Sequence, residues 1–125
     1  MKNIIKAERA PAAIGPYSQA IDTNGILFVS GQIPLDPESG NIVEGGIREQ
    51  TIQVIKNIDE IVKKAGYELT DIVKCTCFLR NLEDFQMMNE IYGAYFKANP
   101  PSRSTFEVSR LPKDVLVEID AIAVR

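Results

Sequence analysis

The most constraining stretch of this sequence is the run from Val115 to Val124 near the carboxyl end. Side chains alternate between the two faces of a strand, so every second residue from Val115 onward gives one wholly apolar face. The other face carries Glu118 and Asp120 among aliphatic residues such as Leu116 and Ile122. A face of that mixed character is not expected to meet plain solvent. The run therefore predicts a strand with something packed on both of its sides.

A shorter strand is predicted just upstream, over Ser102 to Val108, and it carries an arginine. Alternation places Arg103, Thr105 and Glu107 on one side of it. A guanidinium can hold a carboxylate through two parallel hydrogen bonds. Two interpretations stay open at this point. Arg103 could bind a small acid while Glu118 handles a water, or the two could form a structural ion pair at a subunit contact.

Length and charge exclude several classes of protein. A chain of 125 residues predicts a single domain over residues 1–125, large enough to bury a core. The formal net charge is −3 and no cluster of basic residues occurs, so a footprint for nucleic acid is missing. No apolar stretch approaches membrane-spanning length. The absence of a signal peptide and the presence of only two cysteines predict a cytoplasmic protein in a reducing compartment.

The chain contains no histidine and no tryptophan. This removes Ser-His-Asp and Cys-His catalysis and most zinc sites, so neither a metal nor a cofactor is expected. Cys75 and Cys77 lie two residues apart on a predicted strand and point to the same face, where they are interpreted as buried packing. Any chemistry must therefore use carboxylate, arginine, tyrosine, hydroxyl or backbone groups.

Two features in the first third of the chain are typical of a pocket wall. Tyr17 follows Gly15 and Pro16 in a stiff loop, where it could line a pocket or plug a gap in the core. Gly31 lies inside the strand predicted from Gly25 to Ile33, next to Ser30. A glycine there predicts a bulge, or the close approach of a ligand or of a neighbouring side chain.

The remaining pattern predicts an α+β domain. A helix with a long apolar stripe is predicted over Ile47–Ala65, a strand over Ile72–Leu79, and a second helix that begins near Asn81 and ends before Pro100. The order predicts a mixed sheet with both helices on one face. The other face is predicted to collect Phe28, Ser30, Gln32, Lys74, Thr76, Phe78, Arg103, Thr105, Leu116, Glu118, Asp120 and Ile122. No segment is left to cover that face, so self-association is expected, with a pocket at or near the subunit boundary.

Several blocks of this sequence resemble the RidA (YjgF) family of imine deaminases. They are APAAIGPYSQA, FVSGQIPLDP, NEIYGAYF and SRSTFEVSRLPKDVLVEIDAIAVR, and they occur in the family's order and spacing. The resemblance implies a chorismate-mutase-like fold assembled as a homotrimer, with three pockets between adjacent subunits. It also implies hydrolysis of 2-iminobutanoate and 2-iminopropanoate to 2-keto acids and ammonia.

By the same resemblance, Arg103 binds the substrate carboxylate and Glu118 positions the attacking water. The positions that line or adjoin the pocket are Tyr17, Ser30, Gly31, Asn89 and Thr105. Many relatives have a cysteine where this chain has Thr105, so regulation through that thiol is not expected here. Two other functions are compatible with this fold. One is a trimer that binds small carboxylic acids without turnover, and the other is a ribonuclease, which the acidic charge and missing histidine disfavour.

Overall fold

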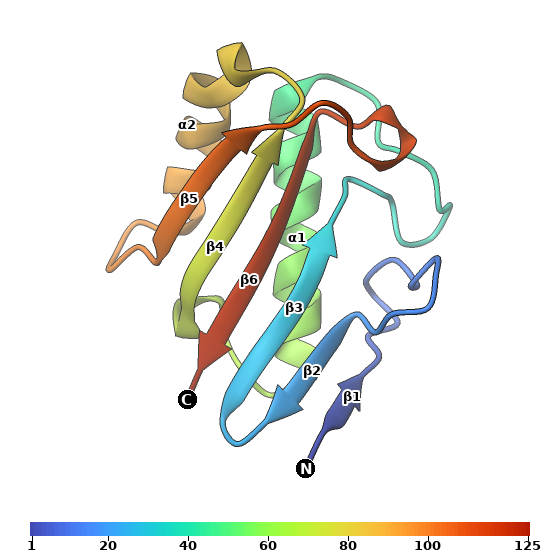
Figure 1. Cartoon of the computed structure of the whole chain (residues 1–125), viewed down its shortest axis with the longest axis vertical. Coiled ribbons are helices and arrows are strands. Elements are labelled where there is room, and N and C mark those ends of the chain that lie inside the picture. Colours follow the sequence, from blue (N-terminus) through green and yellow to red (C-terminus); the bar gives the residue numbers. More distant parts are fainter.

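The computed structural model describes all residues from Met1 to Arg125 and has two layers, a six-stranded sheet and a pair of helices (Figure 1). The strands in spatial order are β1 (Asn3–Ile5), β2 (Ala20–Thr23), β3 (Ile26–Gln32), β6 (Val117–Val124), β4 (Ile72–Leu79) and β5 (Ser102–Glu107). The helices are α1 (Ile47–Lys64) and α2 (Phe85–Tyr95). Both lie behind the sheet in Figure 1, which confirms the predicted α+β architecture with both helices on one face.

The position of β6 in the sheet decides where the candidate site residues lie. It pairs antiparallel with β3 on one side and with β4 on the other, while β5 pairs parallel with β4 at the edge. A turn joins β5 to β6 as predicted, but β4 lies between the two strands. The residues of β5 are therefore one strand further from β6 than their proximity in sequence suggests.

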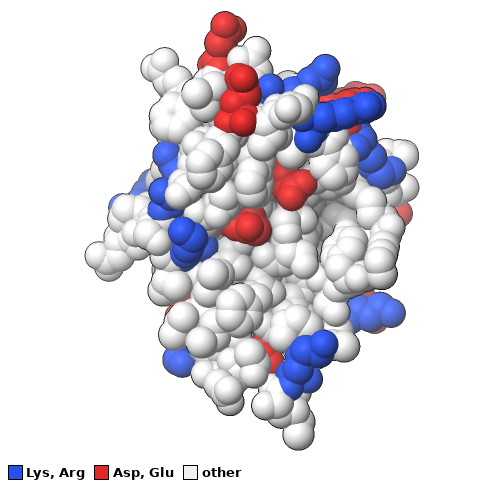
Figure 2. Space-filling model, viewed as in Figure 1, with Lys and Arg blue, Asp and Glu red and all other residues white.

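One face of the sheet has no covering layer. The side chains that the strand register places there are Phe28, Lys74, Thr76, Phe78, Ser104, Phe106, Glu118, Asp120 and Ile122. Phe28 and Phe106 are 45% and 52% exposed. Figure 2 shows this face as largely uncharged, with acidic side chains near its middle. The prediction of an uncovered, mixed apolar and acidic face is confirmed.

Three residues assigned to that face from the sequence lie elsewhere. Arg103 and Thr105 are in register with Cys75 and Cys77, which are buried against the helices, so their side chains point to the helix side. Gln32 is also buried on the helix side, because the register shifts between Val29 and Gln32 and pairs Gln32 with Ile119. The predicted bulge at Gly31 is the cause of this reversal.

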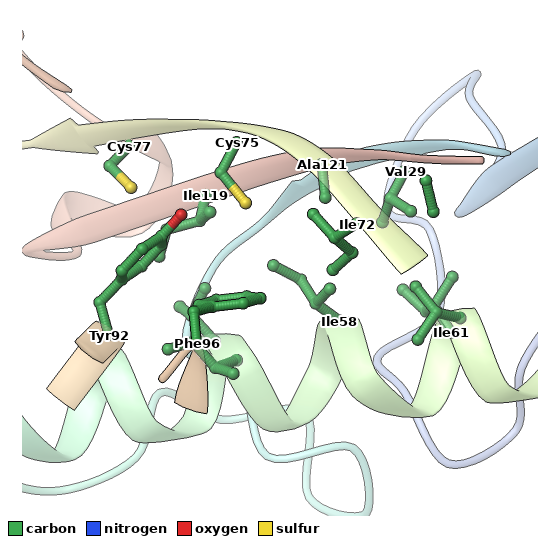
Figure 3. Packing of buried hydrophobic residues seen from close by; sticks show 14 of the residues in the cluster. Val29, Ile58, Ile61, Ile72, Cys75, Cys77, Tyr92, Phe96, Ile119 and Ala121 are labelled. Carbon is green, nitrogen blue, oxygen red and sulfur yellow. The ribbon is translucent and has the colours of Figure 1, made fainter. Parts of the chain in front are cut away.

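The core fills the space between the sheet and the helices (Figure 3). The apolar face of β6 supplies Val117, Ile119, Ala121 and Ala123, and each is at most 2% exposed. The predicted stripe of α1 faces it with Thr51, Val54, Ile55, Ile58, Ile61 and Val62, all buried. The long apolar run at the carboxyl end is therefore a central strand of the fold, and its predicted apolar face packs against α1.

The boundaries of the two helices are also set by local backbone conformation and side-chain hydrogen bonds. Gly66 follows α1 with φ of +85°, a conformation that favours glycine, and the Asn81 side chain accepts a hydrogen bond from the Glu83 N–H. That cap opens a 3₁₀ turn before α2 begins at Phe85. The predicted edge strand at the amino end is present as β1. No helix is long and apolar enough to cross a membrane.

Candidate functional site

A groove at one end of the open sheet face brings together four of the predicted site residues. Tyr17, Ser30, Gly31 and Glu118 line it, together with Ile14, Ile33 and Pro112. These residues come from the amino-terminal loop, the end of β3, the turn before β6, and β6 itself. The groove holds about 720 Å³ of space, including the part open to solvent. The structure thus joins segments about 100 residues apart into one concave surface.

Glu118 is the ionisable group of this groove. Its carboxylate makes no hydrogen bond and no ion pair within the chain, and it is half-buried. Burial raises its pKa, and the nearby negative charge of Asp120 adds to the effect. Asp120 itself accepts a hydrogen bond from the Thr76 N–H at 3.0 Å. A carboxylate that is partly withdrawn from water and has no partner is suited to accept a proton from a water molecule.

Gly31 makes room for that carboxylate. A Cβ placed on residue 31 would overlap the Glu118 side chain. The two alternatives left open for Gly31, a bulge or a close approach, are therefore both present. The approaching group is the side chain of Glu118.

The loop that carries Tyr17 is held by its own hydrogen bonds. Tyr17 is 48% exposed, so it does not plug the core. Its hydroxyl accepts a hydrogen bond from the Ile14 N–H at 3.3 Å. The Ser30 hydroxyl donates to the Ser18 carbonyl at 2.6 Å, which ties the loop to β3. Tyr17 thus forms one wall of the groove.

Gln19 is a positioning residue that sequence reasoning missed. It is buried, and its amide donates hydrogen bonds to the carbonyls of Ala7 and Pro11 at 3.1 and 2.8 Å. Its carbonyl oxygen accepts the Ala7 N–H. One side chain therefore satisfies several loop backbone groups and fixes the segment that presents Tyr17. The signal was a glutamine directly before the apolar start of β2, at the end of a loop rich in proline.

Arg103 lies on the other side of the sheet. Its guanidinium carbon is 4.8 Å from the centre of the Tyr92 ring and 5.5 Å from that of Phe85, both on α2. No hydrogen bond or ion pair joins the guanidinium to any group of the chain. Since a guanidinium carries five N–H donors, Arg103 keeps its capacity to bind an anion.

The structure does not bring Arg103 and Glu118 together within one chain. They lie on opposite faces of the sheet, and β4 separates their strands. Two strand spacings and three residue steps place their Cα atoms ~14 Å apart. No ion pair between them exists inside the chain, so the prediction that both lie on one sheet face is wrong, and a pocket holding both is not formed within a single chain. Both can act on one small ligand only if a second chain supplies one of them.

Asn89 and Thr105 lie on the same side of the sheet as Arg103. Asn89 is four residues after Phe85 and three before Tyr92, so it lies on the same side of α2 as the two rings that contact Arg103. The Thr105 hydroxyl is buried without a hydrogen-bond partner, in register with Cys77. The seven predicted site residues thus form two groups. Tyr17, Ser30, Gly31 and Glu118 lie in the groove, while Arg103, Asn89 and Thr105 lie at the edge formed by β5 and α2.

Cys75 and Cys77 lie beneath this edge as buried packing, as predicted. Burial raises the pKa of Cys75 to about 11 and that of Cys77 to about 12. Both thiols therefore stay protonated at neutral pH, a state in which they are poor nucleophiles.

The fold and the groove define the class of protein to which the chain belongs. Residues 7–125 match the family described as Endoribonuclease L-PSP. The structure of a putative endoribonuclease from Thermotoga maritima superposes with a TM-score of 0.98 at 46% identity, covering 100% of this chain and 98% of that one. Escherichia coli TdcF with bound serine gives a TM-score of 0.95 at 46% identity, covering 99% of both chains.

The chain belongs to the YjgF/RidA family, as its sequence blocks predicted. A RutC family protein of Pyrococcus horikoshii is 54% identical over 123 residues, which is 98% of each chain. The human 2-iminobutanoate/2-iminopropanoate deaminase is 45% identical over 125 residues, covering 100% of this chain and 91% of that protein.

Proposed function

We propose that this protein hydrolyses 2-imino acids such as 2-iminobutanoate and 2-iminopropanoate to 2-keto acids and ammonia. One observation carries the proposal: an arginine and a glutamate, both without partners, lie on opposite faces of the chain. The arginine is suited to bind the substrate carboxylate, and the glutamate is suited to accept a proton from a water. The name of the human relative supplies the reaction class.

The site is proposed to form between subunits of a homotrimer. The open sheet face carries exposed Phe28 and Phe106, which a soluble assembly would cover. A head-to-tail contact sets the β5 edge of one subunit against the groove of the next, and such contacts close into a ring. Arg103 of one subunit then faces Glu118 of its neighbour, with one pocket at each of three boundaries.

The reaction follows from this pairing. Arg103 holds the substrate carboxylate through two parallel hydrogen bonds, which orients the imine carbon toward Glu118 of the adjacent subunit. The protonated imine carbon is electrophilic, and a water adds to it while Glu118 takes a proton from that water. Glu118 returns that proton to the nitrogen of the resulting carbinolamine, and the C–N bond breaks to release ammonia. The hydroxyl proton passes to Glu118 as the keto group forms, and Glu118 then releases it to solvent. Burial raises the pKa of Glu118, which makes this carboxylate a stronger base toward the water.

The other predicted residues have proposed places in this pocket. Tyr17, Ser30 and Gly31 shape the wall around the water on the Glu118 side. Asn89 and Thr105 shape the carboxylate side next to Arg103. The Thr105 hydroxyl has no partner inside the chain and is available to the ligand or to an ordered water.

The test is the release of keto acid and ammonia from freshly generated 2-iminobutanoate. Wild type is compared with Arg103→Ala, and light scattering checks that both have the same oligomeric state. We expect acceleration by the wild type and a loss of at least about 100-fold in the variant, because substrate orientation is lost. Binding of 2-ketobutyrate with no acceleration by the wild type would overturn the deaminase and leave a carboxylate-binding trimer.

A further inference from the structure

The guanidinium of Arg103 is held by aromatic rings rather than by acids. Its carbon lies 4.8 Å from the Tyr92 ring centre and 5.5 Å from that of Phe85, both within the range of a cation–π interaction. No carboxylate or carbonyl of the chain bonds to it. Arginine has a long, flexible side chain, so something must restrict it if it is to bind a small anion with fixed geometry. The two rings are the groups in position to do this.

Tyr92 is the fixed member of this pair. It is 5% exposed and packs against Phe96, with ring centres 4.6 Å apart. Its hydroxyl points toward the buried cysteines (Figure 3) and interacts with the Cys75 thiol. The part of this side chain that contacts Arg103 is its ring, and not its hydroxyl. Phe85, in contrast, is 36% exposed and covers the guanidinium from the solvent side.

Aromatic neighbours affect the Arg103 guanidinium differently from acidic neighbours. An aspartate or glutamate beside Arg103 would occupy its N–H donors and compete with the ligand carboxylate for them. A ring attracts the cation through its face and uses none of those donors. The guanidinium is thus restricted in advance while its hydrogen-bonding capacity stays free, which lowers the entropic cost of binding a carboxylate.

We infer that Tyr92 is a positioning residue, which acts through Arg103 to set the affinity of the site for carboxylate substrates. The inference rests on the proposed function for the identity of the ligand. Tyr92 touches neither the imine carbon nor the water in this arrangement. Its loss should therefore change KM far more than kcat.

The experiment compares three variants of the assembled protein with 2-iminobutanoate as substrate. Tyr92→Leu removes the ring and keeps an apolar side chain, and we expect KM to rise about 5- to 30-fold, from the usual strength of a desolvated cation–π contact, with kcat within about twofold. Tyr92→Phe keeps the ring and should restore KM to within about twofold of wild type. Phe96→Leu removes a neighbouring ring that does not contact Arg103. It should lower stability without raising KM.

Two further readouts separate this inference from the proposed function. Calorimetric binding of 2-ketobutyrate tests the site itself: no binding by wild type would count against the function. Relaxation of the Arg103 Nε–Hε group tests positioning without any ligand. We expect restricted motion in wild type and Tyr92→Phe, and increased motion in Tyr92→Leu. Equal mobility in all three, or equal 2-ketobutyrate affinity in wild type and Tyr92→Leu, would overturn the inference. If Tyr92→Leu fails to assemble, Phe85→Leu at the surface provides the same comparison.

Discussion

Gly31 and Glu118 are in contact across the boundary between β3 and β6, and a Cβ on residue 31 would occupy the space that the Glu118 carboxylate fills. The position of a potential general base is thus set by the absence of a side chain on the neighbouring strand. The obstructed group is the end of a flexible side chain, which can swing away. Substitution of Gly31 should therefore displace Glu118 without unfolding the protein.

We expect Gly31→Ala to lower kcat for imine hydrolysis by at least about tenfold, because a general base out of place loses most of its contribution. The free energy of unfolding should fall by less than about 1 kcal/mol, as for a minor repacking. Gly93→Ala is the matched control, since a Cβ there meets no atom within 4 Å. In a helix that control should be neutral or slightly stabilising. A Gly31→Ala enzyme with wild-type kcat would show that the observed Glu118 position is not used.

The placement of Arg103 and Glu118 on opposite faces predicts complementation between inactive subunits. In the proposed homotrimer, the Arg103→Ala and Glu118→Gln proteins should each lose activity, whereas a refolded equal mixture should recover about a quarter of the wild-type value. That fraction follows because, in the proposed arrangement, each pocket takes its arginine and its glutamate from different subunits of a closed ring. The measurement is specific activity after mixing, with the two unmixed trimers as controls. A mixture no more active than the average of those trimers would place both residues in one chain.

Sequence patterns predicted the fold because the layered architecture depends on apolar periodicity. The stripe of α1 and the apolar face of β6 are long enough to set their own orientation, and the structure confirms both. The strand β2 was missed, since its four residues AIDT form no such pattern. It exists because the ladders from β1 and β3 pair with it on both sides.

The same patterns could not place Arg103. The strand β5 reads SRSTFE and has no apolar face, so alternation shows which residues share a side but not which side is inward. Its register with β4 decides this, and it turns Arg103 toward α2. Residues of the groove were easier to predict, because Gly31 in a strand and a stiff loop before Tyr17 are local signals.

The raised pKa of Glu118 predicts how this residue affects stability with pH. The folded state keeps the Glu118 proton at pH values where the unfolded chain has already lost it, so stability falls as pH rises through that window. This contribution to stability is fully lost once the pH exceeds the pKa of Glu118 in the folded state. Glu118→Gln should therefore be slightly more stable than wild type at pH 7, with the difference disappearing below about pH 4, where the carboxyl is neutral in both states.

Urea unfolding of the assembled protein at pH 7 and at pH 4 measures this difference. Glu90→Gln, on the exposed side of α2, is the control for the loss of one negative charge. A Glu118→Gln protein that is less stable than wild type at pH 7 would mean that a partner subunit stabilises the ionised carboxylate.

The two buried thiols predict a simple chemical result. Burial raises the pKa of Cys75 to about 11 and of Cys77 to about 12, so neither forms thiolate at neutral pH. We expect no reaction with a disulfide reagent in the native state at pH 7, and two reactive thiols per chain in denaturant. Rapid native labelling would show that α2 opens from the sheet on the timescale of the assay.

A partly buried hydrogen bond between Tyr67 and Asp22, at the end of the sheet away from the groove, provides the last prediction. The Tyr67 hydroxyl donates to Asp22 Oδ1 at 2.7 Å, and the Arg125 guanidinium lies 4.4 Å from the centre of the Tyr67 ring. Tyr67→Phe keeps the ring and its contact with Arg125, but it leaves the Asp22 carboxylate without its donor. Because a charged acceptor loses a partner at a partly buried position, the free energy of unfolding should fall by about 1–2 kcal/mol. Tyr95→Phe is the control, since that ring is 37% exposed and should change stability by less than about 0.5 kcal/mol. Equal stability of the two variants would mean that water replaces the lost hydroxyl at Asp22, and that the Tyr67 ring alone holds β2 to the end of α1.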